Sequence, residues 1–425
     1  MKIINLPYGK SNLPLSLPAS FRVDVVRPKA VQPCADPAGE VRRALKKPLA
    51  GFSLPPAEKV QSVAVAINDK TRPVPHDILL PALLSHLQEN GITRDKVTFY
   101  IATGTHVPMP AEEFEKILPA SLIPTINVVS HDCDDEGNLL SLGVTQRGIP
   151  VSVNRRFYES DLKLVVGNIE PHHFAGFSGG YKTASIGVTG RETINRNHIL
   201  LLDPLARVGE FDRNPLRQDI EEIGRMLGIH AALNVVMTPE KEIIRVFFGS
   251  PVSVMQHGIP EVRAISQTEV AQPYDLVIGS AGGYPKDINL YQAQKGLTHS
   301  ALIAKPGAPV VLVAECNEGH GSAPLMKFLQ DVSSVDGIME KFKRLGFQVG
   351  PHKAYQIAAI ARRHPLYLVS SLNAATTRRL LFEPLLDVQE SLQPLLEQLP
   401  AGGRIAVLPK AVNTIPLLAL EETCP

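Results

Sequence analysis

The sequence predicts an α/β protein with two domains, each built on an open, largely parallel sheet. The chain has 425 residues, more than one ordinary core holds, since single cores stop growing at roughly 250–300 residues. Short apolar runs typical of buried strands alternate with segments whose leucines recur at helical spacing. Strand–helix–strand units of this kind close right-handed onto a parallel sheet.

The first such unit lies at residues 62–102. It comprises a predicted strand at 62–68, a helix at 76–90 with five leucines on one face, and a second strand at 97–102. Gly91 follows the helix as a stop signal. Further strands are predicted at 126–130, 162–167, 233–237, 276–279, 309–314, 366–369 and 405–408.

Two features divide the chain. A helix-like stretch ends within 261–272, and Pro273 precedes a new strand, so we expect an N-terminal domain at 1–265 and a C-terminal domain at 273–425. The tail of the second domain can pack back on the first. We expect the Pro-rich first 56 residues to wrap the N-terminal domain as loops and edge strands.

One more helix has a clear start. Asn214 can cap a helix and Pro215 suits its first position, so a helix is predicted from there to Met226.

Composition excludes several classes of protein. Lys and Arg number 43 and Asp and Glu 42, a net charge of +1, so no bulk charge is available to attract nucleic acid or an anionic membrane. No apolar run reaches the roughly 18 residues that span a bilayer. The stretch Met1–Pro7 is too short and too polar for a signal peptide, so we expect a cytoplasmic protein.

The four cysteines are Cys34, Cys133, Cys316 and Cys424. They lie far apart and form no CxxC pair, which disfavours a zinc knuckle, an iron–sulfur cluster and a disulfide framework. We expect unpaired thiols in a reducing compartment.

Polar residues follow two of the predicted strands, and ligands of open α/β sheets bind at such strand ends. Asp69 and Arg72 follow the strand at 62–68, where Arg72 can bind a carboxylate or phosphate; a solvated turn is the alternative. His106 follows the strand at 97–102 and is placed for acid–base work, or it is a structural histidine.

The densest segment runs from Glu170 to Lys182. Its glycines let backbone approach a ligand closely, and successive N–H groups there can cradle an anion. The Lys182 amine behind them can act as a nucleophile or a counter-ion. The spacings of a P-loop and of a GxGxxG dinucleotide fingerprint are both missing. The alternative is a glycine-rich turn with a surface lysine.

Three further segments contain candidate site residues or a turn after a strand. His198 is a candidate metal ligand or a packed histidine, and no second histidine stands at HExxH spacing. Gln292 and Lys295, beside Tyr291, share one helical face that can bind a carboxylate or simply be solvated. The turn Gly319–Gly321 follows a strand, and the sequence assigns it no role.

Together these segments resemble the nickel-dependent lactate racemase family. The matching stretches are Asp69-Lys70-Thr71-Arg72-Pro73-Val74-Pro75, Thr103-Gly104-Thr105-His106, the HxFAGFSGGxK pattern from His172 to Lys182, the ETI..NH pattern ending at His198, and GGYPKDxNxYQAxKG from Gly282 to Gly296. They span most of the chain in the family's order, and their spacings agree.

The resemblance implies an active-site cleft between the two domains and a nickel pincer nucleotide, nickel pyridinium-3-thioamide-5-thiocarboxylic acid mononucleotide. Lys182 would hold this cofactor covalently through a thioamide, and His198, with the tether at Lys182, would hold the nickel. His106 and His172 would be the acid–base groups. The cofactor side of the site would include Asp69, Gly176, Ser178, Gly179 and Gly180. The substrate side would include Arg72, Tyr291, Gln292, Lys295 and His173.

The reaction implied is racemisation or epimerisation at carbon 2 of a 2-hydroxy acid. The C–H bond there is very weakly acidic, so hydride is removed to the cofactor and returned to the other face of a planar 2-keto acid while two histidines handle the hydroxyl proton. Enzymes that build the cofactor are implied as maturation partners; neither nucleic acid nor membrane is.

Two alternatives remain. A nicotinamide-dependent 2-hydroxyacid dehydrogenase is disfavoured by the missing GxGxxG pattern. A non-catalytic nickel or cofactor carrier is disfavoured because His106, His172, Lys182 and His198 are all present.

Three departures from the family pattern bear on the substrate. His173 stands where an apolar or aromatic residue is expected, Tyr181 where an arginine is expected, and Ser185-Ile186-Gly187 lacks a proline. They fit lactate or a larger hydroxy acid such as an aldonate. Adjacent side chains on an extended segment point apart, so we expect His173 to face the pocket wall, away from the target of His172.

Overall fold

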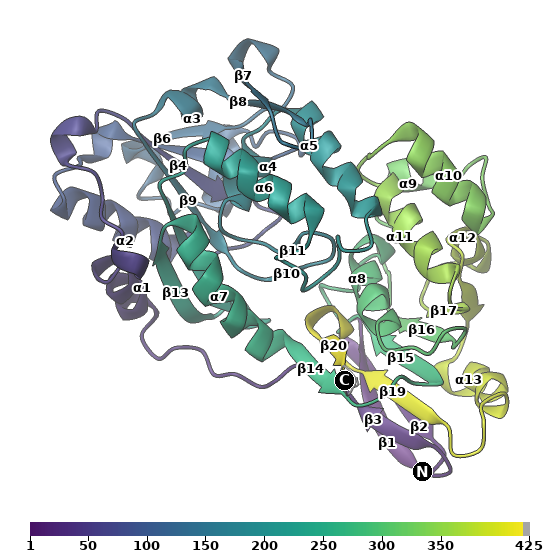
Figure 1. Cartoon of the computed structure of the whole chain (residues 1–425). Helices are drawn as coiled ribbons and strands as arrows, with labels where there is room; N and C mark the ends of the chain where they lie inside the picture. The colour runs from purple at the N-terminus through teal and green to yellow at the C-terminus, as the bar shows by residue number, and fades with distance from the viewer. Residues whose placement is uncertain (420–425) are drawn as a thin grey trace, which may run out of the picture. The chain divides into compact units, whose positions relative to one another are not determined.

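The computed structural model of the chain describes residues 1–419, apart from the side chain of Glu390 (Figure 1). It divides into two compact units, residues 30–264 and residues 1–29 with 265–425, which we call the first and second unit. Each unit contains a six-stranded open sheet with helices. The predicted α/β class with two open, largely parallel sheets is therefore confirmed.

The large sheet of the first unit has the strand order β13-β12-β9-β4-β5-β6. All neighbours are parallel except β12 and β13. The strands of the unit are β4 (Val63–Asn68), β5 (Val97–Ala102), β6 (Asn127–Ser130), β7 (Leu139–Val144), β8 (Pro150–Asn154), β9 (Leu162–Asn168), β10 (Pro171–His172), β11 (Gly176–Phe177), β12 (Ala231–Met237) and β13 (Ile243–Gly249). The helices are α1 (Pro37–Lys46), α2 (His76–Glu89), α3 (Arg155–Glu159), α4 (Lys182–Gly187), α5 (Arg191–His198), α6 (Pro215–Met226) and α7 (Pro251–Ser266), the last of which ends just beyond the unit.

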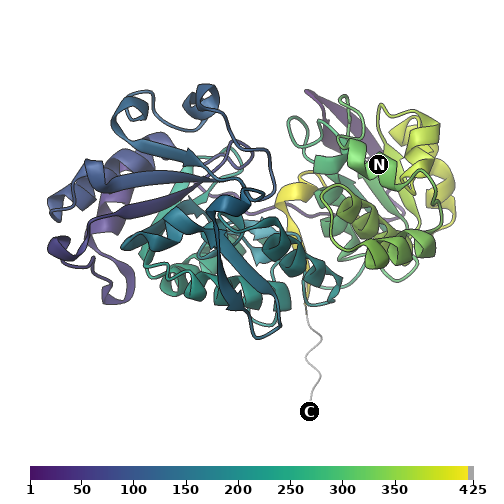
Figure 2. The same cartoon turned by 90° about the horizontal axis from the view of Figure 1, so that it is seen from above.

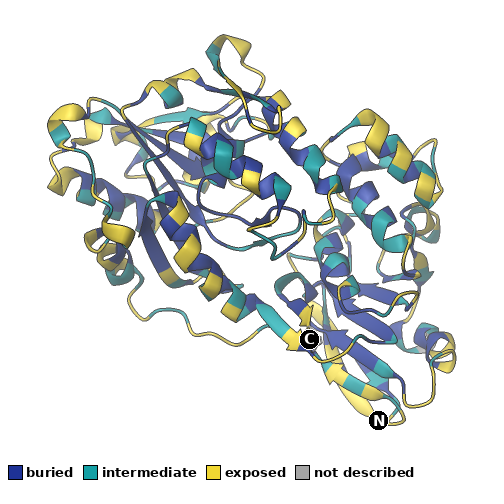
Figure 3. Cartoon of the chain, viewed as in Figure 1, coloured by how far each residue is buried: buried dark blue, intermediate teal, exposed yellow. Residues whose placement is uncertain are grey.

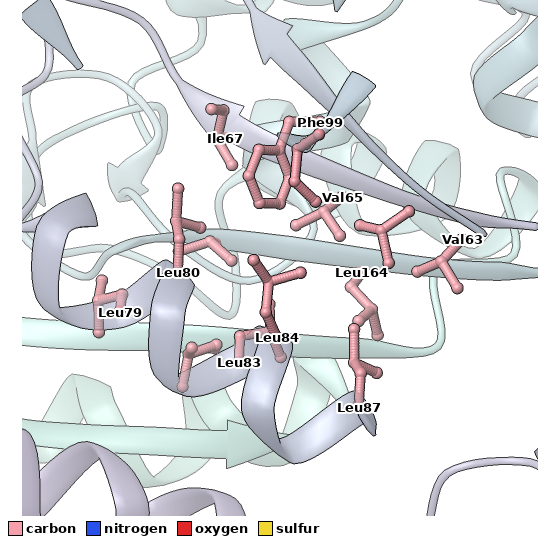
Figure 4. Packing of buried hydrophobic residues seen from close by; sticks show 14 of the residues in the cluster. Val63, Val65, Ile67, Leu79, Leu80, Leu83, Leu84, Leu87, Phe99 and Leu164 are labelled. Atoms are coloured by element: carbon pink, nitrogen blue, oxygen red, sulfur yellow. The ribbon is translucent and has the colours of Figure 1, made fainter. Parts of the chain in front are cut away.

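The core of this unit forms where the leucines of α2 meet the sheet (Figure 4). Every residue of β4 is buried, as expected for a central strand covered on both faces (Figure 3). The side chains packed together in Figure 4 include Val63, Val65, Ile67, Leu79, Leu80, Leu83, Leu84, Leu87, Phe99 and Leu164. Each fully buried leucine stabilises the fold by about 1.5–3 kcal/mol.

The opposite face of the same sheet is covered by α4, which contacts β4, β5 and β9. Close approach requires small residues: a Cβ on Gly187 would lie 2.3 Å from the Cβ of Ala102. The helix α6 packs on α4 in turn. Seen from above, helices lie on both sides of these strands (Figure 2).

The strand order reverses between β4 and β9. The chain runs from β4 to β5 and β6 in one direction, then from β9 to β12 and β13 in the other. Open α/β sheets bind ligands at the carboxyl ends of the strands beside such a switch point. The loops after β4, β5 and β9 are therefore the place to look for a site.

The large sheet of the second unit is parallel throughout, with the order β18-β17-β16-β15-β19-β3. The strands of this unit are β1 (Lys2–Tyr8), β2 (Ser11–Leu17), β3 (Arg22–Val25), β14 (Gln267–Val270), β15 (Leu276–Ser280), β16 (Val310–Val313), β17 (Leu366–Val369), β18 (Glu383–Leu385), β19 (Arg404–Leu408) and β20 (Ile415–Leu418). The helices are α8 (Leu290–Ala301), α9 (Ala323–Phe328), α10 (Val335–Leu345), α11 (Pro351–Ala361), α12 (Ala374–Arg379) and α13 (Val388–Glu397).

The start of the chain departs from its prediction. Residues 1–29 do not wrap the first unit but belong to the second. The strand β3 extends the second sheet beside β19, and the hairpin of β1 and β2 buries Leu6 and Leu15 in that unit's core. Strand pairing between segments some 380 residues apart is invisible in local sequence patterns, which explains the error.

The end of the chain also has a partner within its own unit. The strand β20 pairs in parallel with β14, which directly follows α7. The expected return of the tail to the first domain stays a prediction, and residues 420–425 lie outside the described residues.

Two smaller predictions concern membranes and cysteines. Within residues 1–419 no helix is both long enough and apolar enough to cross a bilayer. Cys34, Cys133 and Cys316 are unpaired, as expected, and Cys424 lies outside the described part of the chain.

Candidate active site

The candidate site lies in the first unit, at the ends of three adjacent strands. The strand β4 has β9 on one side and β5 on the other, and both neighbours run parallel to it. Their carboxyl ends therefore lie at one edge of the sheet. Asp69 and Arg72 follow β4, His106 follows β5, and the segment from His172 to Lys182 follows β9.

Asp69 and His106 form a hydrogen-bonded pair. The Nδ1 atom of His106 lies 2.6 Å from Oδ2 of Asp69, while Thr71 donates its N–H and hydroxyl to Oδ1 at 3.1 and 2.7 Å. Burial alone would raise the pKa of the Asp69 carboxyl, but the hydrogen bonds from His106 and Thr71 outweigh it and lower the pKa. An ionised Asp69 keeps the proton of neutral His106 on Nδ1, which leaves Nε2 as the basic atom.

Arg72 lies in the same loop as Asp69 and carries a guanidinium without an ion-pair partner for its charge among the described residues. Its guanidinium makes no hydrogen bond or ion pair with any other residue of 1–419. It lines a pocket of about 280 Å³ together with Asp69 and the first turn of α2. A free guanidinium presents a fork of donors that matches a carboxylate.

His172 is held in the opposite tautomer. It ends β10, and the chain turns at once into β11, so that the N–H of Ala175 donates to Nδ1 of His172 at 3.2 Å. In the neutral ring the proton then sits on Nε2. At their Nε2 atoms His106 thus offers a base and His172 a hydrogen-bond donor.

His173 is placed differently from its prediction. Its ring stacks on that of His172, with centroids 4.6 Å apart and planes 17° from parallel. The two side chains therefore lie together and do not point apart. The alternation of an extended strand does not apply, because β10 ends at His172 and the tight turn to β11 begins there.

Phe174 links these rings to His198. Its buried ring meets His172 and His173 edge to face, at centroid distances of 4.6 and 4.3 Å. It meets the ring of His198 in the same manner at 5.1 Å. The hairpin after β9 and the last residue of α5 are thus brought to one place, which the sequence predicted only through the family resemblance.

Lys182 begins α4 and is buried. Burial lowers the pKa of its amine well below the usual value, and the guanidinium groups of Arg72 and Arg217 lower it further, against the opposing effect of Glu170. Within residues 1–419 the amine has no hydrogen-bond or ion-pair partner. A lowered pKa makes a lysine amine a better nucleophile, because more of it is unprotonated at a given pH.

Two N–H groups of the glycine-rich segment are engaged inside the protein and do not contribute to the predicted anion cradle. The N–H of Ser178 donates to the carbonyl of Glu170 at 2.8 Å, and that of Gly180 donates to Oδ1 of Asn234 at 2.7 Å. Gly179 and Gly180 have positive φ, and a Cβ on Gly180 would lie 2.6 Å from Met255. These glycines are therefore required by internal packing, whatever they bind.

A buried arginine that the sequence analysis missed holds this segment in place. Arg217 on α6 is fully buried and donates to the carbonyls of Phe177 and Gly179 at 3.0 and 3.1 Å. Its Nε donates to Glu221 at 2.8 Å, and its guanidinium lies over the ring of Phe211. Four interactions of one guanidinium fix the backbone that leads into Lys182.

The signal for Arg217 was present in the helix pattern. Leu216, Ile220 and Ile223 mark the buried face of α6, and Arg217 is buried among them with its partner Glu221 four residues on. An ion pair at i,i+4 spacing that falls on the apolar side of a helix indicates a structural task inside the protein.

His198 is the last residue of α5 and is buried. Its Nδ1 lies 3.1 Å from Oδ1 of Asn197. Asn197 also contacts α6 through Leu216 and Asp219. Neither Asn197 nor Asp219 was identified from the sequence.

The second unit carries the other predicted site residues on α8. Gln292 and Lys295 share a face, with the amine donating to Oε1 of Gln292 at 3.4 Å. The carbonyls of Gly319 and His320 accept from the N–H groups of Leu290 and Tyr291, so the turn of unassigned role holds the start of α8. The predicted part of Tyr291, Gln292 and Lys295 in substrate binding stays a prediction.

A buried lysine supports this helix from α11. Lys353 donates to Oε1 of Gln294 at 2.8 Å and lies over the ring of Tyr291. Burial lowers its pKa well below the usual value, and Lys295 lowers it further. The sequence analysis missed it, since a lone lysine in a helix gives no signal of burial.

One other group could in principle hold a metal ion. Asp132, Cys133 and Asp134 offer ligand atoms within 4.8 Å of one another in the described part of the chain. Asp134 already forms a bidentate pair with Arg191, at 2.6 and 2.7 Å. The group is therefore accounted for as a surface ion pair.

Similarity to known proteins covers both units. The model of the lactate racemase N-terminal domain matches residues 8–209, and that of the lactate racemase C-terminal domain matches residues 270–415. A lactate racemase of Thermoanaerobacterium thermosaccharolyticum is 30% identical over 424 residues, which is 98% of this chain and 99% of the relative. A lactate racemase of Lactiplantibacillus plantarum is 28% identical over 385 residues, 88% of this chain and 90% of the relative.

Solved structures agree. The lactate racemase apoprotein of T. thermosaccharolyticum superposes with a TM-score of 0.89 at 28% identity, covering 98% of this chain and all of that one. The fold is shared with a crystal structure of a protein from Thermotoga maritima. The two are 18% identical and superpose with a TM-score of 0.65, covering 90% of this chain and 98% of that one. On this similarity the chain belongs to the lactate racemase family and is a racemase, an enzyme of the isomerase class.

Proposed function

We propose that the protein inverts carbon 2 of a 2-hydroxy acid, with lactate as the first substrate to examine. The observation that carries the proposal is the pair of histidines at the ends of the strands that flank β4. His106 is held with a basic Nε2 by Asp69, and His172 is held with a protonated Nε2 by the N–H of Ala175. Inversion needs a group that takes and returns the hydroxyl proton, and a hydrogen-bond donor can hold the oxygen in the meantime.

In this proposal His106 takes the hydroxyl proton of the substrate at Nε2. The ionised Asp69 stabilises the imidazolium that forms, because its carboxylate accepts the Nδ1–H throughout. The imidazolium of His106 would then return this proton to the oxygen of the inverted product, while neutral His172 donates a hydrogen bond from its Nε2–H to the same oxygen. A histidine of matched pKa contributes typically 10²–10⁴-fold to the rate of such a step.

Arg72 would orient the substrate. Its guanidinium has no competing hydrogen-bond partner among residues 1–419, and it lines the pocket beside Asp69. A bidentate contact with the carboxylate would fix carbon 2 relative to the two histidines. Tyr291, Gln292 and Lys295 remain candidates for further contacts with the substrate.

The residues present fit a covalently held nickel nucleotide. Lys182 offers a buried amine with a lowered pKa, suited to forming a thioamide, and His198 offers an imidazole whose Nδ1 is already engaged with Asn197. Such a nickel pincer nucleotide, when bound, supplies a site that accepts and returns hydride at carbon 2. The enzymes that build it would then be required for maturation.

The test is a comparison of protein made with and without the enzymes that build the cofactor, in medium with nickel. Intact mass and metal analysis report loading, and chiral chromatography follows D- and L-lactate from either enantiomer. We expect loaded protein to carry both adduct and nickel and to bring either enantiomer to an equal mixture. Loaded protein that leaves both lactates and C4–C6 hydroxy acids unchanged would overturn the proposal.

A further inference from the structure

The end of α5 is tied to the start of α6 by one buried asparagine. Oδ1 of Asn197 lies 3.1 Å from Nδ1 of His198. Nδ2 of Asn197 lies 3.0 Å from the carbonyl oxygen of Leu216 and 3.0 Å from Oδ2 of Asp219. Asn197, His198 and Asp219 are all buried, so water does not compete for these contacts.

Only one orientation of the Asn197 amide satisfies these neighbours. The carbonyl of Leu216 can only accept a hydrogen bond, whatever the protonation state of Asp219. Turning the amide over would set its oxygen against that carbonyl and would break two hydrogen bonds. Oδ1 must therefore face His198, and because an amide oxygen only accepts, Nδ1 of His198 must be the donor.

The direction of that hydrogen bond fixes the state of the His198 ring. With the proton of the neutral imidazole on Nδ1, the lone pair that can coordinate a metal is on Nε2. The edge-to-face contact with Phe174 at 5.1 Å restricts rotation of the same ring. Metal-binding histidines commonly depend on such a partner for the second nitrogen, and losing it typically costs 10–100-fold in metal affinity.

We propose that Asn197 and Asp219 are positioning residues that hold His198 in the Nδ1-protonated tautomer and so present Nε2 to the nickel. This inference rests on the proposed function for the metal, but the tautomer itself is a property of the protein without cofactor. The Leu216 carbonyl and the Asp219 carboxyl on α6 fix the Asn197 amide, and the amide in turn fixes the His198 ring at the end of α5.

The test uses the Asn197→Leu/Asp219→Leu double variant. It removes the amide and the carboxyl together, so that neither of these two side chains is left buried without the other, which reduces the cost in stability. Asn197→Ala gives the same test through a smaller change if the double variant does not fold. Asn195→Leu is the first control: it replaces an asparagine of the same helix whose side chain makes no hydrogen bond to any residue of 1–419. Asp219→Asn is the second control, because its amide oxygen can still accept the hydrogen bond from Asn197.

The first measurement is nitrogen NMR of full-length protein without cofactor, labelled in histidine, with the His198 signals assigned by their loss in His198→Gln. We expect parent, Asn195→Leu and Asp219→Asn to show a protonated Nδ1 and an unprotonated Nε2. The double variant should lose this preference. A parent protonated on Nε2, or an unchanged tautomer in the double variant, would overturn the positioning role.

The second measurement is nickel per protein in loaded enzyme after dialysis. We expect retention to fall about tenfold or more in the double variant and to stay at the parent level in both controls. Equal retention in parent and double variant would overturn the positioning role alone. A parent that carries the cofactor adduct but no nickel would overturn the proposed function together with it.

Discussion

The carboxylate of Asp69 and the imidazole of His106 meet at 2.6 Å although 37 residues separate them in the chain. They meet because β4 and β5 are parallel neighbours whose carboxyl ends share one edge of the sheet. The N–H and the hydroxyl of Thr71 both donate to the other carboxylate oxygen of Asp69, Oδ1. The direction of each hydrogen bond in this group is therefore fixed.

Asp69→Asn should abolish this arrangement without removing a side chain. The two donors of Thr71 would hold the new amide oxygen, because they already bind Oδ1. The amide nitrogen would then face Nδ1 of His106 and force the proton onto Nε2. We expect kcat for 2-hydroxy acid racemisation to fall about 10²-fold or more, with a smaller change in KM.

The matched control for this change is Asp212→Asn, at an exposed aspartate whose side chain makes no hydrogen bond with any residue of 1–419. It should keep the kcat of the parent. If Asp69→Asn also kept it, with its fold and cofactor content unchanged, His106 would not be the base of the reaction.

Much of the fold was predictable because it follows from local patterns. The predicted helix from Pro215 to Met226 has these bounds in the structure, and the strand at 97–102 agrees residue for residue. Asp69 and His106 were also identified, since polar residues directly after two apolar strands of a parallel sheet must lie near each other.

The misses have a common physical cause: they depend on contacts between distant segments or on the path of a tight turn. Strand β3 pairs with β19 at the other end of the chain. His173 stacks on His172 because the hairpin closes immediately after it. Arg217 and Asp219 are buried on α6. The spacing of Arg217 and Glu221 on the apolar side of that helix indicates a structural task, but no local pattern predicts that Arg217 binds the backbone of Phe177 and Gly179 or that Asp219 binds Asn197.

Lys182→Ala should abolish covalent attachment of the cofactor and leave the fold intact. The buried amine has no hydrogen-bond or ion-pair partner within 1–419, so its removal leaves no buried polar group alone. We expect the intact mass of the variant to equal that of the bare chain after production beside the cofactor-building enzymes. Lys59→Ala, at an exposed lysine, should carry the adduct as the parent does. An adduct of undiminished mass on Lys182→Ala would show that another residue is the tether.

His299 should make the second unit less stable as the solution becomes acidic. The ring is fully buried on α8, its Nδ1 lies 2.8 Å from the carbonyl oxygen of Ala411, and burial lowers its pKa to about 4. In the unfolded chain a histidine titrates near 6.5. Between these values the unfolded state binds more protons, so the free energy of unfolding falls as the pH drops from about 6.5 to about 4.

His299→Asn removes that titration. Its free energy of unfolding should be lower than that of the parent at pH 7.5, because packing is lost. Between pH 6 and 4.5, however, it should depend less on pH, by about 1 kcal/mol per pH unit. Urea unfolding across this range measures both effects, and His257→Asn, at an exposed histidine, is the control. Parallel pH dependences in parent and His299→Asn would contradict a lowered pKa for His299.

The substrate range should depend on His173, whose ring lies against that of His172, the proposed hydrogen-bond donor to the substrate oxygen. Phenylalanine can keep this stacking but cannot form hydrogen bonds, so His173→Phe isolates the polar contribution of the imidazole. A site that bonds an extra substrate hydroxyl discriminates by about 1–3 kcal/mol per hydrogen bond against a substrate that lacks it. We therefore expect the parent to prefer a C4–C6 polyhydroxy acid over lactate in kcat/KM, and His173→Phe to move that ratio toward lactate by about tenfold. Measurements with both enantiomers of each acid, alongside His257→Phe, check this. If lactate is already the best substrate of the parent, or if the ratio does not move, His173 serves only to pack against His172.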